Sequence, residues 1–336
     1  MLSRIDRLAY HSQHLSFAIN ATLMSEATRV VTRAPRPKVT APVLREINRR
    51  RQELHRTDLA NVDAGMYPRE LLFDIPTRAY LKQLPRLLAD APNVVRRRQQ
   101  KNFKDIPAVD KDRFPPYYRR TFHWQSDGYF SEFSAEVYEV GVELLFRGTA
   151  DVMRRQVIPP ITRHLGQNAE GRLIDIGCGT GRTLHQIAIA HPKLRLTGVD
   201  LSPAYIKHAR KQLIELDDIT LANENGEDLP WADATFDVAT STYMFHELPR
   251  NARRNVVREM MRVVKPGGLV VIEDSAQLVE SPVFEPVLRA FPEDFHEPFY
   301  ADYLEDDLVE LLREVGFVDV QMSPQLVAKV VTARRP

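Results

Sequence analysis

The feature that most constrains the fold is a glycine-rich turn between an apolar run and a helical run. Residues 172–213 read RLIDIGCGTGRTLHQIAIAHPKLRLTGVDLSPAYIKHARKQL. RLIDI has the length and apolar character of a buried strand, glycines follow at 177, 179 and 181, and a helical face is then marked by Leu184, Ile187 and Ala188. In a strand–turn–helix unit, backbone N–H groups and the helix N-terminus lie beside whatever binds at the turn. The segment therefore predicts a nucleotide-like ligand.

Alternating strand and helix patterns continue from this turn to the end of the chain. Further strand patterns occur at 194–199, 219–222, 236–241, 269–274, 317–322 and 326–332, with helical faces between them near 206–216, 256–264 and 304–315. Such alternation is typical of a parallel sheet covered by helices on both sides, with the ligand outside the carboxyl ends of the strands. We therefore expect an α/β, Rossmann-like, doubly wound and mostly parallel seven-stranded sheet over residues 166–336.

Residues 1–165 lack this alternation and predict a largely helical N-terminal region. A first helical segment precedes the stretch RAPRPKVTAP (33–42), which predicts an extended linker. A second helix is expected over 43–60, and short helices with hard stops are expected over 67–118, where seven prolines occur. A further helix follows from about residue 131, where serines can cap it, and we expect it to pack on the C-terminal half.

The net charge of +1 conceals two unlike halves. Residues 1–150 hold 25 Lys and Arg against 17 Asp and Glu, whereas the remainder holds 21 against 28. A basic first half can face nucleic acid, an anionic membrane surface or an acidic substrate, or it can complement the acidic second half at a shared interface. The basic runs at 49–51 and 96–101 are interpreted as solvated helix faces, because no RNA-binding module accompanies them.

Cysteine usage and hydropathy indicate a reducing compartment. The lone Cys178 excludes a disulfide framework and a cysteine metal site within the chain. No window approaches the roughly 18 apolar residues of a transmembrane helix, and the first thirty residues lack the uninterrupted apolar core of a secretory signal. We expect a cytoplasmic protein without a transmembrane segment. A peripheral membrane contact and the oligomeric state stay open.

The register of the glycines separates two classes of cofactor. The dinucleotide fingerprint G-x-G-x-x-G requires glycine at position 182, where this chain has Arg182. Asp175, two residues before the first glycine, would repel a pyrophosphate but suits a cationic ligand. The pattern DIGCGTG resembles the first motif, acid-x-G-x-G-x-G, of the class I S-adenosylmethionine (SAM) dependent methyltransferases. The residues that match it are Asp175, Gly177, Gly179 and Gly181.

The resemblance implies roles for this loop and for the end of the next strand. The loop would wrap the methionine part of SAM, with Cys178 inside it and Asp175 ordering the SAM amino group directly or through water. Asp200 follows Gly181 by 19 residues and would accept hydrogen bonds from both ribose hydroxyls. Leu201 would then lie against the adenine.

Two later segments extend the resemblance. ENGEDLPWADATFD (224–237) resembles the family's segment around the adenine edge, where Asn225 would accept from the adenine amino group and Gly226 would offer its backbone N–H. STYMFHELP (241–249), which begins at Ser241, resembles the stretch that faces the transferred methyl. Because these segments occur in the family's order, the likeness spans roughly 166–336.

The motif sequences most resemble those of the ubiquinone and menaquinone biosynthesis type of C-methyltransferase and of related small-molecule methyltransferases. The resemblance implies SAM as cofactor and methyl transfer to oxygen, carbon or nitrogen of a small-molecule or lipid-like acceptor, with the helical region as a cap. Two alternatives stay open: an RNA or protein methyltransferase that docks through the basic N-terminal half, and a non-catalytic SAM-binding factor. Nucleic acid is the less favoured partner, and the glycine register disfavours a nicotinamide dehydrogenase.

Candidate catalytic residues follow the fourth strand and lie in an aromatic segment. His246 is expected near the point of methyl transfer, where it either removes a proton from the acceptor or packs beside the cofactor, and Tyr243 is similar. Glu247 directly follows His246 in the sequence. His123 lies in the aromatic-rich stretch 117–138, whose aromatic side chains are interpreted mainly as core.

Polar residues are the preferred pocket candidates in that aromatic stretch, namely His123, Gln125 and Asp127. A second set lies between the fifth strand and the last helix, where it either contributes to acceptor specificity or folds its loop down: His296, Tyr300 and Tyr303. No metal is predicted, because no histidine pair has the spacing of a zinc-protease helix and no cysteine cluster exists.

Overall fold

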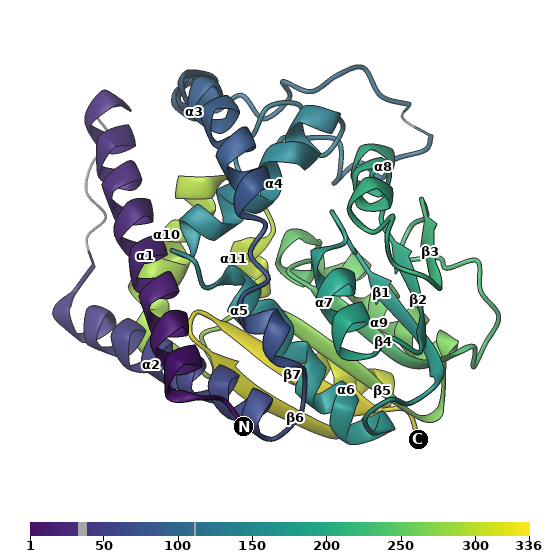
Figure 1. The fold of residues 1–336 in the computed structure, drawn as a ribbon. Helices are drawn as coiled ribbons and strands as arrows, with labels where there is room; N and C mark the ends of the chain where they lie inside the picture. The colour runs from purple at the N-terminus through teal and green to yellow at the C-terminus, as the bar shows by residue number, and fades with distance from the viewer. Residues whose placement is uncertain (33–38, 111) are drawn as a thin grey trace.

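The computed structural model of the chain describes residues 1–32, 39–110 and 112–336, and of residues 27–32 the backbone alone. Most of the linker predicted over 33–42 lies outside the described residues. The strands are β1 (Gly171–Ile176), β2 (Leu194–Val199), β3 (Ile219–Ala222), β4 (Phe236–Thr242), β5 (Val264–Ser275), β6 (Val318–Gln325) and β7 (Ala328–Arg334). Within the described residues they form one sheet in the order β3-β2-β1-β4-β5-β7-β6 (Figure 1).

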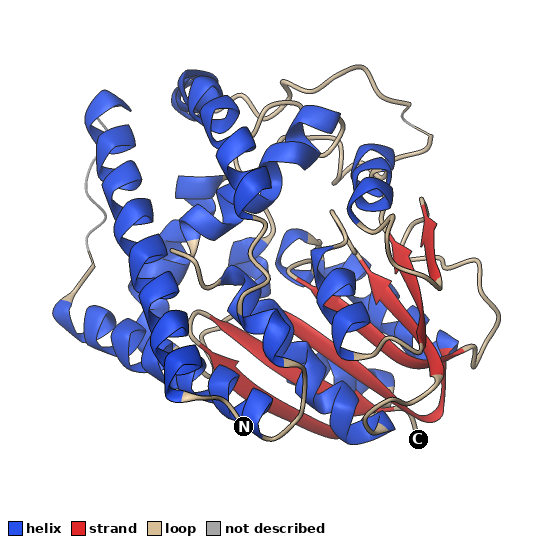
Figure 2. Ribbon diagram, in the orientation of Figure 1, coloured by secondary structure: helices blue, strands red, loops and turns tan. Residues whose placement is uncertain are grey.

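Most neighbouring strands of this sheet are parallel. β1 pairs with β2 and β4, β2 with β3, and β4 with β5 in parallel, while β7 runs antiparallel to both β5 and β6. The predicted Rossmann-like, doubly wound and mostly parallel seven-stranded sheet is confirmed (Figure 2). Because the strand order reverses between β1 and β4, the chain leaves their carboxyl ends in opposite directions and a crevice forms there.

The central strands are apolar because helices cover both of their faces. In β1, Ile174 packs into the core on one face and Leu173 into the core on the other, and both are fully buried. The Ile174 face is covered by α9 (Arg250–Val263) and α12 (Leu308–Val315). The Leu173 face is covered by α6 (Ile158–Leu165), α7 (Arg182–Ala190) and α8 (Pro203–Gln212).

The N-terminal region is largely helical, as predicted. Its elements are α1 (Arg4–Thr32), α2 (Ala41–Asp63), η1 (Arg69–Leu72), α3 (Thr77–Gln100), α4 (Glu132–Leu145), α5 (Ala150–Arg154) and η2 (Arg155–Val157). The predicted serine cap is present, because the Ser131 hydroxyl accepts a hydrogen bond of 3.1 Å from the Ser134 N–H at the start of α4. α4 packs against α8, which confirms its expected contact with the C-terminal half.

The expectation of short helices with hard stops was wrong for α3. This 24-residue helix runs through Pro85 and Pro92. A proline removes one backbone donor and disfavours the helix interior, but tertiary contacts can outweigh that cost. In α3 the side chain of Arg97 is buried and donates to the Trp124 carbonyl at 2.9 Å and the Ser126 hydroxyl at 2.7 Å. These contacts hold the C-terminal turns of α3 against the aromatic stretch.

The N-terminal region shares its core with the sheet. Tyr67 and Leu71 belong to the same buried cluster as Leu173 of β1. Asp58 of α2 and Arg155 of η2 form a buried ion pair of 2.5 Å within the N-terminal region, and Val157 of η2 belongs to the same cluster as Leu173. The proposed division at residue 165 follows the end of α6, a helix of the sheet layer, and stays a prediction.

The remaining short elements follow β4 and β5. They are η3 (Phe245–Glu247), η4 (Pro282–Phe284), α10 (Glu285–Phe295) and α11 (Tyr300–Tyr303). α11 lies against η3, so the insertion after β5 returns to the end of β4. None of the described helices combines the length and the apolar character needed to cross a bilayer.

Candidate active site

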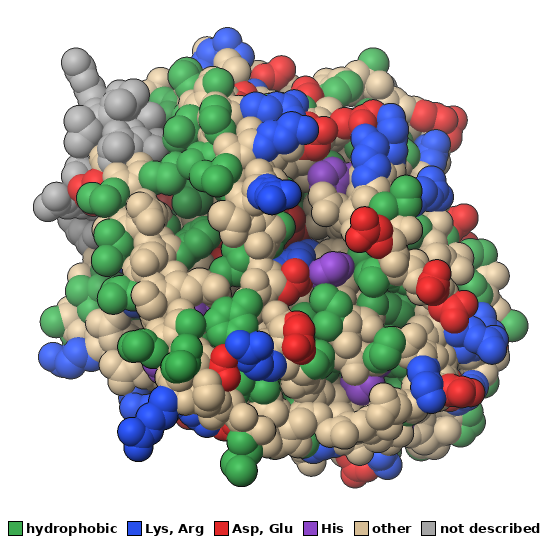
Figure 3. Space-filling model, in the orientation of Figure 1, with side chains coloured by type: hydrophobic (Ala, Val, Ile, Leu, Met, Phe, Trp, Pro, Cys, Tyr) green, Lys and Arg blue, Asp and Glu red, His purple; other side chains and the backbone are tan. Residues whose placement is uncertain are grey.

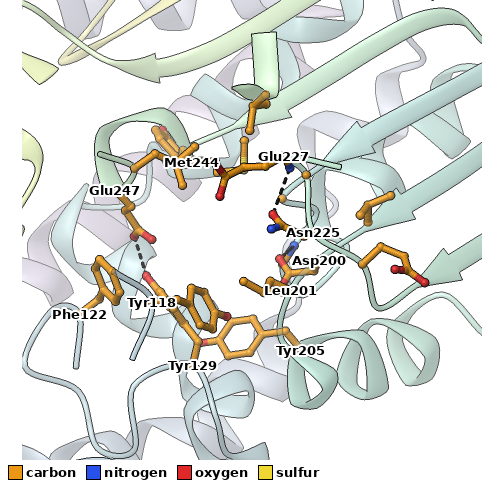
Figure 4. Close-up of a pocket in the computed structure, with 18 of the residues that line it drawn as sticks. Tyr118, Phe122, Tyr129, Asp200, Leu201, Tyr205, Asn225, Glu227, Met244 and Glu247 are labelled. Atoms are coloured by element: carbon orange, nitrogen blue, oxygen red, sulfur yellow. Dashed lines mark hydrogen bonds between the residues drawn. The ribbon is translucent and has the colours of Figure 1, made fainter. Parts of the chain in front are cut away.

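A cleft of about 810 Å³, counted out to its open mouth, lies at the carboxyl ends of β1, β2 and β4 (Figure 4). Its lining joins the glycine loop and the β3–β4 connection to the aromatic stretch of the N-terminal region. The lining residues are Tyr117, Tyr118, Phe122, Tyr129, Tyr138, Gly177, Gly179, Val199, Asp200, Leu201, Tyr205, Glu224, Asn225, Gly226, Glu227, Thr242, Tyr243, Met244, Glu247, Leu248 and Val256.

The glycine loop brings backbone to the cleft. Gly177 and Gly179 have φ of 75° and 54°, a region that side chains disfavour. A Cβ at Gly177 would lie 2.5 Å from the Met244 sulfur, whereas one at Gly179 would meet nothing within 4 Å. Gly181 and the buried Cys178 belong to the same turn but lie behind the lining. Glycine at 177 is therefore required both by conformation and by space.

Asp200 ties the end of β2 to the glycine loop. Its carboxylate accepts hydrogen bonds from the Gly179 N–H at 2.9 Å and from the Ser202 N–H at 2.8 Å. Burial raises the pKa of Asp200 to about 6, although both N–H groups act in the opposite direction. The carboxylate is thus fixed on the lining of the cleft, at the position predicted from the sequence.

Asp175 lies one layer behind this surface. It is buried, is not part of the lining, and accepts a 2.7 Å hydrogen bond from the Thr240 hydroxyl. Burial raises its pKa to about 7, against the effect of Thr240, and the charge of Asp200 raises it further. Ser241 is also buried behind the lining, where its hydroxyl donates to the Ile176 carbonyl at 2.7 Å.

The β3–β4 connection contributes Asn225 and Gly226 to the lining. The Asn225 amide oxygen accepts from the Glu227 N–H at 3.0 Å, so one of its two acceptor positions is already used within the turn (Figure 4). A Cβ at Gly226 would lie 2.7 Å from a methyl carbon of Ile176. Gly226 therefore allows this connection to pass close over the end of β1.

Aromatic side chains enclose the other end of the cleft. The lining takes Tyr117, Tyr118, Phe122, Tyr129 and Tyr138 from the aromatic stretch, and Tyr205 and Tyr243 from the sheet domain. This reverses the sequence expectation, in which His123, Gln125 and Asp127 were favoured over the aromatics, because none of these three polar residues is part of the lining. The aromatic rings pack on one another and also face the cleft; Phe122 and Tyr129, for example, stack with ring centres 5.2 Å apart.

His123 lies beside the aromatic end, between two carboxylates. Its Nε2 is 3.1 Å from Glu247 and its Nδ1 is 2.8 Å from Glu297, which follows α10. Burial alone would lower the pKa of His123, but the two carboxylates raise it to about 10. The Tyr129 hydroxyl also donates to Glu247 at 2.5 Å. At neutral pH His123 is therefore a cation that holds Glu247 in place.

The same three side chains form a group that could hold a metal ion. One ligand atom from each of His123, Glu247 and Glu297 lies within 4.8 Å of the others. Both ring nitrogens of His123 already face a carboxylate, so a metal would have to displace one of these ion pairs. This group could not be predicted from the sequence, because His123 and Glu247 are 124 positions apart and Glu247 and Glu297 are 50 positions apart.

His246 and Tyr243 differ in their access to the cleft. Tyr243 is part of the lining, and burial followed by the charge of Glu273 raises its pKa well above 10, so its hydroxyl stays protonated. His246 is buried outside the lining, and its Nδ1 lies 2.7 Å from Asp274. Burial would lower the pKa of His246, but Asp274 raises it to about 9. At neutral pH His246 is therefore protonated on both ring nitrogens and cannot accept a further proton.

The insertion residues fold their loop onto the sheet. His296 packs on Trp124 with ring centres 4.4 Å apart, and the Tyr303 hydroxyl donates to the Ser275 carbonyl at 2.6 Å. Tyr300 and Tyr303 are buried beside His246, with ring centres 5.8 and 6.2 Å from it. None of these three insertion residues is part of the cleft lining.

Comparison with known proteins identifies the family. Residues 173–268 match the family described as methyltransferase domain. The O-methyltransferase resE of Aspergillus sclerotiorum is 31% identical over 175 residues, which cover 50% of this chain and 63% of that relative. The demethylmenaquinone methyltransferase of Halalkalibacterium halodurans is 31% identical over 180 residues, which cover 47% of this chain and 71% of that relative.

The chain belongs to the SAM-dependent methyltransferases. A solved O-methyltransferase family protein from Burkholderia thailandensis has 19% identity and a TM-score of 0.46, covering 62% of this chain and 63% of that one. The match to resE spans less than two thirds of that relative's length. The family resemblance predicted from the glycine loop is confirmed, and with it SAM as the cofactor of the methyltransferase.

Several residues in or beside the cleft of this methyltransferase were not predicted from its sequence. Tyr117 reaches Glu227 through a 2.7 Å hydrogen bond that spans 110 positions, and Met244 covers Gly177. Glu297 approaches His123 from a loop that follows α10. Only Met244 had a local signal, because it lies in the segment that resembles the family's methyl-facing stretch. The other contacts depend on how the N-terminal region folds over the sheet.

Proposed function

We propose that this methyltransferase transfers the methyl group of SAM to an oxygen or carbon of a small aromatic or lipid-like acceptor that carries no negative charge. The supporting observation is the chemistry of the lining, which presents seven aromatic side chains and the carboxyl groups of Asp200, Glu224, Glu227 and Glu247. No described lysine or arginine is part of that lining. Phosphorylated or carboxylated acceptors would therefore be repelled, whereas neutral rings can stack.

The names of the relatives agree with such an acceptor. The fungal relative is an O-methyltransferase, and the bacterial relative methylates demethylmenaquinone. A further relative, from Syntrophotalea carbinolica, is named a ubiquinone/menaquinone biosynthesis C-methyltransferase, so transfer to oxygen and transfer to carbon both occur among proteins similar to this chain. The choice between them is part of the experiment below.

The residues proposed to hold the cofactor share the glycine-loop end of the cleft. SAM, when bound, supplies a methyl group on a positively charged sulfur. Gly177 and Gly179 leave room for it, since a Cβ at the first of them would fill the space next to Met244. Asp200 offers a fixed carboxylate, and Leu201, Asn225 and Gly226 complete this part of the lining. Four of the predicted cofactor-binding residues lie behind the lining and support the shape of the site without contacting the cofactor: Asp175, Cys178, Gly181 and Ser241.

We assign proton removal from the acceptor to Glu247 rather than to His246. Glu247 is on the cleft lining, while His246 is buried against Asp274 and already protonated. His123 and Tyr129 orient the Glu247 carboxylate through hydrogen bonds of 3.1 and 2.5 Å. Alignment of the acceptor by the aromatic rings supplies the rest of catalysis, because methyl transfer mainly requires positioning and exclusion of water.

The experiment is incubation with methyl-labelled SAM and two acceptor sets, followed by mass spectrometry. One set contains neutral phenols and hydroquinones, and the other contains their carboxylated or phosphorylated counterparts. We expect label in the neutral set and at least tenfold lower rates in the charged set. A preference for the charged acceptors would contradict the proposal. Binding of SAM without label transfer to either set or to a whole metabolite extract would favour the non-catalytic alternative.

The role of Glu247 is tested with the variant Glu247→Gln. We expect kcat to fall about 10- to 100-fold for a phenolic acceptor, in the range of a lost general base, while SAM affinity changes less than twofold. The matched control is Glu293→Gln, an exposed glutamate of α10 outside the lining. Equal activity of both variants would remove Glu247 from the mechanism.

The alternative of an RNA or protein methyltransferase that docks through its basic N-terminal half gains no support from the face of the molecule drawn in Figure 3. On the face drawn in Figure 3, the Lys and Arg side chains of described residues are interspersed with Asp and Glu. A methyltransferase that docks on RNA is expected to bind it in a strongly salt-dependent way. Cytoplasmic location stays a prediction from the sequence.

A further inference from the structure

A second cavity lies apart from the cleft, between α1 and α2 and the turn that follows α4. It encloses about 910 Å³, counted to its open mouth, and shares no residue with the cleft lining. Its lining consists of His11, His14, Leu15, Ala18, Arg51, Gln52, His55, Arg56, Arg147 and Thr149. In Figure 1, α1 and α2 occupy the left of the molecule, away from β1, β2 and β3. We call this space the α1–α2 cavity.

Three arginines line the α1–α2 cavity without an acidic partner among the described residues: Arg51, Arg56 and Arg147. The neighbours Arg49 and Arg50 on the same helix, by contrast, both pair with Glu46. The Arg51 Nε is buried and has no hydrogen-bond partner in the described part of the chain. Burial, and then the nearby charge of Arg147, lower the pKa of Arg51. Two guanidinium groups thus approach each other with no described carboxylate between them.

Two buried histidines add unsatisfied polar atoms to the same wall. His14 and His55 are 7% and 9% exposed, and their ring centres lie 4.6 Å apart. The His14 Nδ1 donates to the Gly148 carbonyl at 3.0 Å, because a carbonyl can only accept. The Nε2 atoms of both rings are buried and have no partner among the described residues. Leaving such buried atoms unpaired is unfavourable, so a missing partner is expected.

We propose that the α1–α2 cavity is an anion site that takes the phosphate group of a small ligand. Unpaired guanidinium groups are the side chains that bind phosphate oxygens best, and here the half-buried Arg51 lines the same cavity as the exposed Arg56 and Arg147. A metal ion is the weaker occupant, since three arginines would repel it. The space exceeds a bare phosphate, and Leu15 and Ala18 supply an apolar wall for the rest of the ligand.

The same chemistry admits two sources for the phosphate. One is a soluble phosphorylated metabolite, and the other is a lipid headgroup. Leu15 is 63% exposed at the cavity, and Leu8 and Ile19 on the same helix are 73% and 51% exposed. The experiment therefore has one arm with inorganic phosphate and one with phosphatidylcholine vesicles that contain phosphatidic acid.

Calorimetry on the full chain gives the first measurement. We expect saturable binding of inorganic phosphate, weakened at least tenfold in Arg51→Met and in Arg147→Met. The matched control is Arg45→Met, an exposed arginine of α2 outside the cavity. Thermal unfolding of each variant shows whether the fold is kept. Cosedimentation with the vesicles, but not with pure phosphatidylcholine, and its loss in the same two variants would identify the lipid source.

Proton uptake gives a second measurement that a nonspecific charge effect would not produce. Burial, and then the charges of His55 and Arg155, lower the pKa of His14 to about 3, whereas Asp58 acts in the opposite direction. The charged groups facing the two rings are His11, Arg51, Asp58 and Arg155. A bound phosphate would raise the histidine pKa values, so we expect proton uptake on binding at acidic pH and shifted imidazole resonances of His14 and His55.

Three results would overturn the proposal. The first is absence of saturation with both phosphate and the acidic vesicles on folded protein. The second is equal weakening in Arg45→Met and in the two cavity variants. The third is binding of Zn²⁺ that is unaffected by the arginine variants and blocks phosphate, which would assign the histidines to a cation. None of these measurements uses methyl transfer, so they are independent of the proposed activity.

Discussion

Asp200 joins two parts of the cofactor end that the sequence could only place in order along the chain. It accepts from the Gly179 N–H across 21 positions and from its near neighbour Ser202. A carboxylate that is fixed by two backbone donors does not need to be reoriented when a ligand binds. Its oxygens are therefore preorganised for hydroxyl donors, which is the arrangement that the family resemblance implied.

The first prediction concerns the charge of this carboxylate. Asp200→Asn keeps the shape but removes the charge and places an amide NH₂ where an acceptor now faces a backbone N–H. We expect SAM affinity to fall about 10- to 100-fold, the effect of losing about 1.5–3 kcal/mol from a charged hydrogen bond. Isothermal titration calorimetry measures it. Asp228→Asn, on the exposed β3–β4 connection, is the control, and equal affinities of the two variants would refute the assignment.

The second prediction is a pH dependence of SAM affinity. Burial raises the pKa of Asp200 to about 6 and that of Asp175 to about 7, so both carboxyls gain protons as the pH falls below these values. A cationic ligand favours the ionised forms, and its affinity should rise with pH until both groups are ionised. We expect the Kd of SAM to fall several-fold between pH 5.5 and pH 8. A flat profile, or one unchanged by Asp200→Asn, would contradict this.

Site residues were predictable where the signal was local. Gly177, Gly179 and Asp200 lie within one β-α-β unit, whose spacing fixes their relative positions before any tertiary contact forms. Glu297 and Tyr117 could not be found in this way, because each reaches its partner only after distant segments pack together. Their residue types are common, and nothing in the adjacent sequence distinguishes them from surface residues.

At the scale of elements, the strands were easier to predict than the helices of the first half. A strand buried on both faces must be apolar along its whole length, so β1, β2 and β5 stand out in the sequence. α3 did not, because two prolines argue for helix ends that its tertiary contacts overrule. α9 ends directly before β5, and residues 265–268 lie within β5, where its pairing with β4 shifts register. Local signals therefore located the sheet but not the cap.

The third prediction belongs to the turn between β1 and α7. In Gly177→Ala, the new Cβ would lie 2.5 Å from the Met244 sulfur and the residue would keep φ near 75°. In Gly179→Ala, the backbone has a similar strain but nothing lies within 4 Å. We expect Gly177→Ala to lose about 1–3 kcal/mol of unfolding free energy more than Gly179→Ala, the usual cost of overpacking. Urea unfolding compares them.

The partner substitution decides whether the clash is the cause. Met244→Ala removes the atoms that the new methyl group would meet, so the double variant with Gly177→Ala should recover most of the difference. Failure of this rescue would show that backbone strain, rather than the contact with Met244, makes glycine necessary at 177.

At the scale of the molecule, the N-terminal region and the sheet form one packed unit. Tyr67 and Leu71 share a core with β1, and the buried Asp58–Arg155 pair ties α2 to η2, whose Val157 belongs to that core. Tyr10 and Tyr67 also donate to Asp58, at 2.6 and 2.5 Å. The first half is therefore more than a detachable cover over the cleft, and its loss would expose apolar surface of the sheet layer.

The fourth prediction tests the ion pair that joins α2 to η2. Arg155→Met leaves the Asp58 carboxylate buried without its cation, and we expect the unfolding free energy to fall by about 3–5 kcal/mol. The double variant Asp58→Asn with Arg155→Met should be more stable than the single one. Arg49→Met, which breaks an exposed pair, should cost less than about 1 kcal/mol. A cost for Arg155→Met as small as that of Arg49→Met would show that the buried pair does not hold α2 to η2.

The two ends of the sheet have a consequence for how the molecule behaves among its own copies. β3, at one edge, has four residues, and β6, at the other, shifts register between Val318 and Gln321 and carries Pro324. Short length, an irregular ladder and a residue without an N–H each spoil an open edge as a template for another strand. The chain can thus hold buried, largely apolar central strands in crowded solution without inviting fibrillar stacking.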